Sequence, residues 1–99
     1  MGRYDDPQKM FPKKWAATRK KILKRDGHRC MFEDNKGRCR HKKRLQMHHI
    51  IPKKEAPLLI WSERNLITLC VKHHKIVTGN EADYVVSFTK ILGKQKKKE

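Results

Sequence analysis

Two pairs of adjacent histidines are the residues of this sequence best suited to chemistry. His48 and His49 end the run "LQMHH" before "IIP", and His73 and His74 follow "LCVK". Neighbouring side chains on a strand point to opposite faces, and on a helix they differ by about 100° in direction. The two rings of each pair are therefore expected to serve different sites.

Cysteines and one of these histidines have the spacing of a metal site. Cys30 and Cys39 are separated by eight residues, and Cys70 and His73 form a C-x2-H pair. Four soft or borderline ligands in two distant pairs predict a tetrahedral structural zinc site. The first pair is wider than the usual C-x2-C, so residues 31–38 must bulge outward, and His41 is an alternative ligand to Cys39.

Composition favours zinc over the simpler interpretation of three buried cysteines and surface histidines. Only 36% of the 99 residues are hydrophobic and an equal 36% are charged. A chain this short and polar has little core in which to bury cysteines and is expected to need a metal or a partner for stability. Zinc binding supplies such stability, because in a small domain it contributes folding free energy.

The charge of the chain predicts a polyanionic partner. Lys and Arg total 26 against 10 Asp and Glu, which gives a net charge of +16. Nucleic acid is the polyanion that a small protein meets most often, and it is favoured over a solubility function, a basic assembly tail or binding to anionic lipid. No apolar run approaches the length of a membrane span or a signal peptide, and three cysteines cannot all pair. We therefore expect a cytoplasmic protein with free or metal-bound thiols and no contact with membranes.

The expected elements follow from periodicity and from breaker residues. Trp15, Ile22 and Leu23 predict a helix over residues 13–25, which Asp26 and Gly27 end. Residues 28–43 are expected to form a loop or a metal-organised knuckle. A strand over residues 44–51 is expected to end at Pro52, with His48 and His49 on opposite faces.

The elements of the second half of the chain are predicted from the same signals. A loop over residues 53–64 is expected to lead to a short strand over residues 65–70 and a short helix over 71–79, ended by Gly79. Residues 80–92 fit either a strand or a helix. An irregular lead-in over residues 1–12 and a disordered basic tail over residues 93–99 leave residues 13–92 as the single domain.

At this point the sequence resembles a known family. The segments "KRDGHRC", "HHIIP", Asn65 with Leu66, and "LCVKHH" occur in the order and spacing of the HNH endonucleases, in their zinc-stabilised form. The resemblance covers residues 15 to about 79. It implies an α+β fold, namely a small zinc-stapled domain with a ββα-metal core, also called a His-Me finger, plus flanking helices.

The resemblance also implies a role for each motif residue. His48 and His74 would be the protein ligands of a catalytic divalent cation, Mg²⁺, Mn²⁺, Zn²⁺ or Ni²⁺. His49 would be the general base that activates water, and Asn65 would brace the loop between the strands. Thr78, one helical turn after His74, occupies a position that completes the metal site in some members but is a poor ligand.

The sequence therefore predicts a metal-dependent HNH endonuclease that nicks or cuts DNA with low sequence specificity. A non-catalytic zinc-ribbon module that binds nucleic acid is the alternative, although it gives no role to His49. By analogy with small phage nucleases, packaging proteins are expected partners, and an accessory role in packaging is a third alternative. Glu81 and Asp83 are expected to be solvated, with a secondary metal contact as the alternative. Residues expected to contact phosphate are Arg19, Arg25, Lys53 and Lys54.

Overall fold

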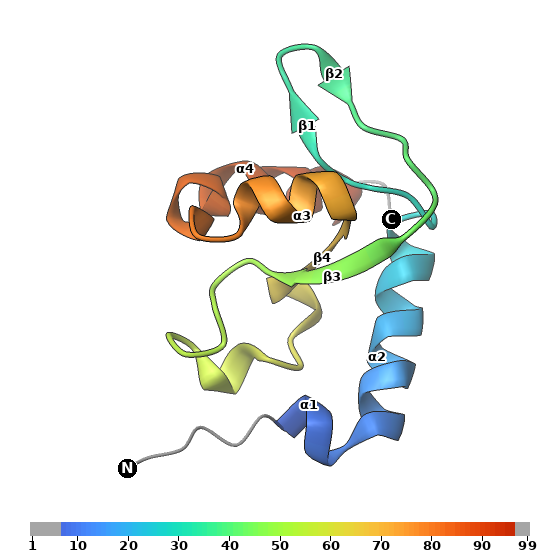
Figure 1. The fold of residues 1–99 in the computed structure, drawn as a ribbon, viewed down its shortest axis with the longest axis vertical. Coiled ribbons are helices and arrows are strands. Elements are labelled where there is room, and N and C mark those ends of the chain that lie inside the picture. Colours follow the sequence, from blue (N-terminus) through green and yellow to red (C-terminus); the bar gives the residue numbers. More distant parts are fainter. Residues whose placement is uncertain (1–6, 97–99) are drawn as a thin grey trace.

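The fold is α+β, as predicted, and it contains two small antiparallel sheets, one of which lies in residues 28–43, where the sequence predicts a loop or knuckle. The computed structural model describes residues 7–96 (Figure 1). Its elements are, in order, α1 (Pro7–Met10), α2 (Pro12–Arg25), β1 (Glu33–Asp34), β2 (Gly37–Arg38), β3 (Leu45–His49), the 3-10 turns η1 (Pro57–Leu59) and η2 (Glu63–Asn65), β4 (Leu66–Cys70), α3 (Val71–Val77) and α4 (Glu81–Lys96).

The centre of the fold is the two-stranded ribbon of β3 and β4 followed directly by α3. The strands are antiparallel, with Leu45 opposite Cys70 and His48 opposite Ile67. All five residues of β4 are buried. Its sequence, LITLC, is accordingly a largely apolar run and does not alternate between apolar and polar residues. In Figure 1, α3 and α4 lie on one side of this ribbon and α1 and α2 on the other. The ribbon therefore separates two environments, one for each face of β3.

Asp26 ends α2 and attaches it to β4. The chain turns at Gly27 and His28, whose φ angles of +72° and +55° lie in the left-handed region, so the "DG" stop that the sequence predicts is confirmed. The Asp26 carboxylate is 1% exposed and accepts hydrogen bonds from the backbone N–H of Thr68 at 3.0 Å and from Arg25 Nε at 2.8 Å. A buried charge needs such partners, and here they fix the position of the helix against the strand.

Aromatic side chains join the hairpin of β1 and β2 to the two C-terminal helices. The Phe32 ring stacks on the His73 ring of α3 with 4.1 Å between centroids. It also meets Phe88 of α4 edge-on at 6.5 Å. Phe88 and Ile91 are buried in the main core. Residues 80–92, which the sequence left between strand and helix, are thus helical from Glu81 onward because one face of α4 covers this core.

The two chain ends are more regular than the sequence predicts. The lead-in expected to be irregular contains α1 and, at Pro12, the start of α2, since proline favours the first helical turn. The tail expected to be disordered from Gly93 is helical as far as Lys96, because extending an anchored helix costs little. Residues 1–6 and 97–99 lie outside the described part. No helix between residues 7 and 96 is long and apolar enough to cross a bilayer.

Candidate functional site

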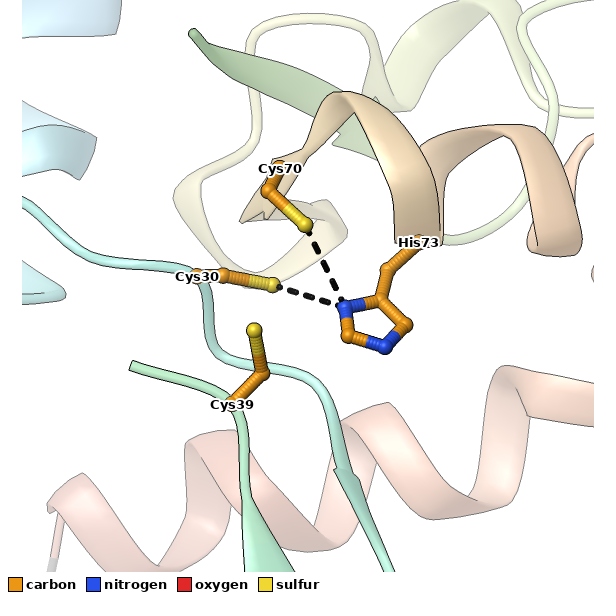
Figure 2. A group of neighbouring side chains, drawn as sticks. All are labelled: Cys30, Cys39, Cys70 and His73. Carbon is orange, nitrogen blue, oxygen red and sulfur yellow. Dashed lines mark hydrogen bonds between the residues drawn. The ribbon is translucent and has the colours of Figure 1, made fainter. Parts of the chain in front are cut away.

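Three cysteines and one histidine meet at one point, as Figure 2 shows. The ligand atoms of Cys30, Cys39, Cys70 and His73 all lie within 4.8 Å of one another. His73 Nδ1 is 3.5 Å from the sulfur of Cys30 and 3.3 Å from the sulfur of Cys70. Tetrahedral zinc bonds imply about 3.6 Å between a sulfur and a nitrogen ligand. These four residues, here termed the Cys/His centre, can therefore hold a metal ion with little rearrangement.

Local backbone bonds explain how distant ligands meet. The hairpin of β1 and β2 projects from the body of the fold (Figure 1), and its base is closed by hydrogen bonds from Cys39 N to Phe32 O and from Cys30 N to His41 O, both at 2.8 Å. Residues 31–38 bulge outward in this way, as the wide cysteine spacing predicts. Cys39 provides the third sulfur, whereas His41 is exposed and contributes its backbone carbonyl to the hairpin.

The thiols of this centre differ in acidity. Burial raises the pKa of Cys30 to about 12. Burial also raises the pKa of Cys70, but hydrogen bonds from the backbone N–H of His73 and from the two other cysteines outweigh it, so the pKa of Cys70 lies below its usual value. A thiol binds metal as thiolate. Cys70 therefore loses its proton more readily than Cys30.

A second constellation surrounds a pocket of about 320 Å³ at the end of β3. It takes side chains from both faces of the strand, because the pocket opens where β3 stops. The residues that line it come from α2, β3, the following loop, α3 and the start of α4; they are Trp15, Met47, His48, His49, Pro52, Lys53, His74, Thr78 and Glu81. The structure thus brings His48, His49 and His74 to one cavity, here termed the histidine pocket.

His48 faces the helical side of the ribbon. Its ring is 4% exposed and lies edge-on to the ring of His74, with 5.7 Å between centroids. Burial, and then the charge of His74, lowers the pKa of His48 to about 4, which keeps the imidazole neutral. His48 Nε2 is buried and has no hydrogen-bond partner among the described residues. A buried neutral imidazole with an unsatisfied nitrogen is suited to a metal ion.

His49 faces the other side of β3. Its ring stacks on Trp15 of α2 at 6.0 Å and an angle of 16°. Its Nε2 lies 3.2 Å from the carbonyl oxygen of Ile60. Because a carbonyl only accepts, Nε2 carries the proton in this bond and the basic lone pair is on Nδ1. The two adjacent histidines therefore have different surroundings, as the strand geometry predicts.

Asn65 holds the loop that follows His49. Its side-chain oxygen accepts a hydrogen bond from Ile51 N at 2.8 Å, and its amide nitrogen donates to Ile51 O at 3.1 Å and Leu59 O at 3.4 Å. Its backbone oxygen accepts from Ile50 N at 2.8 Å. The side chain is 5% exposed. These bonds fix both ends of the loop between β3 and β4, and so fix the carbonyl of Ile60 that contacts His49.

A family comparison agrees with this arrangement. The sequence profile described as HNH endonuclease matches residues 28–80, which is more than half of the chain and includes both the Cys/His centre and the three histidines of the pocket. The chain belongs to the HNH endonuclease family. No curated protein and no solved structure matches it.

Glu81, which the sequence predicts to be solvated with a secondary metal contact as the alternative, lines the pocket. It starts α4, and its carboxylate accepts a hydrogen bond from Gly79 N at 3.0 Å. This bond and one from its own backbone N–H lower the pKa of Glu81, with smaller contributions from His48 and His74. Among the described residues, the ligand atoms that converge to 4.8 Å are those of the Cys/His centre; His48, His74 and Glu81 stand further apart.

The expected DNA contacts of this HNH domain differ in what they already bind. Arg25 donates to Asp26, to Glu63 O and to Leu66 O, so its guanidinium holds the fold together. Arg19 donates to Leu45 O at 3.1 Å and is partly buried. Lys53 lines the pocket, and Lys54 is exposed. Lys53 at the pocket and the exposed Lys54 thus remain candidate phosphate contacts, whereas the guanidinium of Arg25 is engaged within the fold.

Proposed function

We propose that this HNH domain is a metal-dependent DNA endonuclease that nicks or cuts with low sequence specificity. The observation that carries the proposal is the histidine pocket, in which His48, His49 and His74 surround one cavity and His48 Nε2 is left without a hydrogen-bond partner among the described residues. His48 and His74 are proposed to hold a divalent cation there, and their neutral imidazoles suit Mg²⁺ less than Mn²⁺, Ni²⁺ or Zn²⁺.

The proposed chemistry divides the work between the two faces of β3. When bound, the cation supplies charge neutralisation for the scissile phosphate and for the leaving 3′-oxygen. His49 Nδ1 takes a proton from a water molecule, whose oxygen forms a bond to phosphorus as the bond to the 3′-oxygen breaks. The Ile60 carbonyl stabilises the imidazolium that results, because Nε2–H already donates to it. Trp15 and Asn65 keep the base and its loop in position.

The Cys/His centre has a separate task in this proposal. Cys30, Cys39, Cys70 and His73 offer three sulfurs and one nitrogen with no further ligand position, which is the donor set of a structural zinc site. Zinc at this point would join the hairpin, the end of β4 and the first turn of α3. Since α3 also carries His74, the Cys/His centre would also fix the position of His74.

Charge and exposure support DNA as the substrate. The net charge of +16 favours a polyanion through counterion release, which carries no sequence information. Lys53 lines the pocket and Lys54 is exposed; both are proposed phosphate contacts, together with Arg19. A phage packaging protein as partner stays a prediction that rests on the resemblance alone.

Plasmid cleavage tests the proposal. Zinc-loaded protein is incubated with supercoiled plasmid and Mg²⁺, Mn²⁺, Ni²⁺, Zn²⁺ or EDTA, and the nicked and linear products are measured on a gel. We expect cleavage with at least one cation and none with EDTA. His49→Ala should cleave at least about 100-fold more slowly, as expected for loss of a general base, and should bind duplex DNA as the wild type does.

His41→Ala is the matched control, because His41 is an exposed histidine outside the pocket. It should cleave at the wild-type rate. Two results would instead support the zinc-ribbon binding module. One is a protein that binds DNA but does not cleave it with any of the cations tested. The other is a His49→Ala variant that cleaves normally.

A further inference from the structure

Glu81 is a charged side chain in the histidine pocket for which neither the motif nor the proposed mechanism has a use. It is the one acidic residue among those that line the described pocket. The chain reaches it through a tight reversal after α3, in which Gly79 adopts a φ of +89° and Asn80 N donates to Val77 O at 2.8 Å. This turn returns the first residue of α4 to the cavity that holds His74.

The carboxylate is held in a fixed direction. Glu81 Oε2 accepts a hydrogen bond from Gly79 N at 3.0 Å, and its charge acts on both His48 and His74. Thr78, at the position one turn beyond His74, donates its hydroxyl to His74 O at 2.7 Å. Among the residues that line the described pocket, Glu81 is therefore the one that offers a carboxylate oxygen beside the imidazoles of His48 and His74.

Two neutral imidazoles alone give a cation little electrostatic attraction in a chain of net charge +16. A nearby carboxylate offsets part of that repulsion. The ligand atoms of His48, His74 and Glu81 do not converge to 4.8 Å among the described residues. A cation held by the two imidazoles would therefore meet this carboxylate through one of its bound waters rather than directly.

Building on the proposed function, we propose that Glu81 completes the cation site as an outer carboxylate that accepts hydrogen bonds from water bound to the ion. Such a partner adds negative charge and fixes the hydrated face of the ion. It makes the site suitable for cations that keep several waters and prefer oxygen, such as Mn²⁺ and Mg²⁺. Glu81 is in this sense a positioning residue, because it acts through water.

Mn²⁺ binding measured by electron paramagnetic resonance tests this role without reference to cleavage. The zinc-loaded wild type, Glu81→Gln and Asp83→Asn are titrated with Mn²⁺, and zinc content and melting temperature are recorded for each. Glutamine keeps the shape and an acceptor for Gly79 N–H but removes the charge. We expect Glu81→Gln to raise the Mn²⁺ dissociation constant by about 10–100-fold, as for other outer-shell partners of metal ligands.

Asp83→Asn is the matched control, since it removes the same charge from an exposed residue of the same helical turn. Its dissociation constant should stay within about twofold of the wild type, as expected for a solvent-screened charge. Equal binding by Glu81→Gln and the wild type, or an equal loss in Asp83→Asn, would overturn the proposal. If Glu81→Gln melts early, Glu81→Ser, which retains an acceptor at the start of α4, replaces it with the same expected loss.

The same titration separates this inference from the proposed function. His74→Ala should abolish Mn²⁺ binding if the pocket holds the ion at all. If His74→Ala loses Mn²⁺ binding and Glu81→Gln binds Mn²⁺ as the wild type does, the role of Glu81 is refuted and the proposed function stands. A wild type that binds no Mn²⁺ at the pocket would contradict both.

Discussion

The Cys/His centre and the histidine pocket both take a side chain from the short helix α3, and they differ in how complete they are. In the first, four ligand atoms already stand within 4.8 Å of one another, so an ion placed there has no position left for substrate. In the second, the rings of His48 and His74 are 5.7 Å apart beside a cavity of about 320 Å³. A closed donor set serves folding, whereas an open one leaves room for a phosphate and water.

Adjacent residues of one helical turn supply both sites. His73 points to the sulfurs (Figure 2), and His74 points to His48. One small scaffold can thus serve two separate groups of ligands, because neighbouring side chains diverge by the angle that a helix imposes. Variants of the two sites should therefore fail in different ways.

Cys70→Ser should give the largest effect. Structural zinc contributes about 10–16 kcal/mol of apparent binding free energy in zinc-finger peptides, which is as large as the whole stability of a typical domain, about 5–15 kcal/mol. We expect the variant to lose zinc and cooperative melting, as followed by metal analysis and circular dichroism. The exposed His41→Ala variant should keep both. A Cys70→Ser protein that folds cooperatively without metal would remove the structural role of this centre.

Asn65→Ala should damage the pocket while leaving the Cys/His centre loaded. The variant loses the bonds to Ile51 and Leu59, which should cost about 1–3 kcal/mol of unfolding free energy. Plasmid nicking should fall by about 10–100-fold, because small displacements of a catalytic group are costly. Zinc content should remain at the wild-type level. As a comparison, Asn35→Ala in the exposed hairpin turn should change neither property; nicking unaffected in Asn65→Ala would argue against the brace.

The sequence predicts much of this comparison, for identifiable reasons. The types and spacing of Cys30, Cys39, Cys70 and His73 define a metal group before any contact is known, and the structure confirms that they meet. The alternation of a strand places His48 and His49 in different surroundings. Both conclusions depend on local chemistry and periodicity, which the sequence contains.

Other features depend on tertiary contacts. "YVVSFTKIL" contains β-branched residues that suit a strand, yet burial of Phe88 and Ile91 makes it a helix, since packing overrides propensity. The sequence predicts that Gly79 ends a helix, but not that the turn there returns Glu81 to the pocket. The hydrogen bonds that the Arg25 guanidinium donates to Asp26 and to two carbonyl oxygens likewise depend on how α2 packs against β4.

Trp15 should give the smallest effect. Its ring stacks on that of His49, a contact worth about 0.5–1.5 kcal/mol. Trp15→Ala should therefore slow nicking by about 3–10-fold at saturating cation, whereas Trp15→Phe, which retains an aromatic face, should stay close to the wild type. Mn²⁺ affinity and zinc content should be unchanged in both. Equal rates for Trp15→Ala and Trp15→Phe would show that stacking does not position the base.

The independence of the two metal sites is tested most directly by counting metals in single-histidine variants. Native mass spectrometry of the folded protein in Mn²⁺ should show one zinc and one manganese per chain for the wild type. We expect His74→Ala to retain zinc and lose manganese, and His73→Ala to lose zinc. Manganese retained by His74→Ala, or zinc lost from it, would contradict the assignment of these adjacent histidines to separate centres.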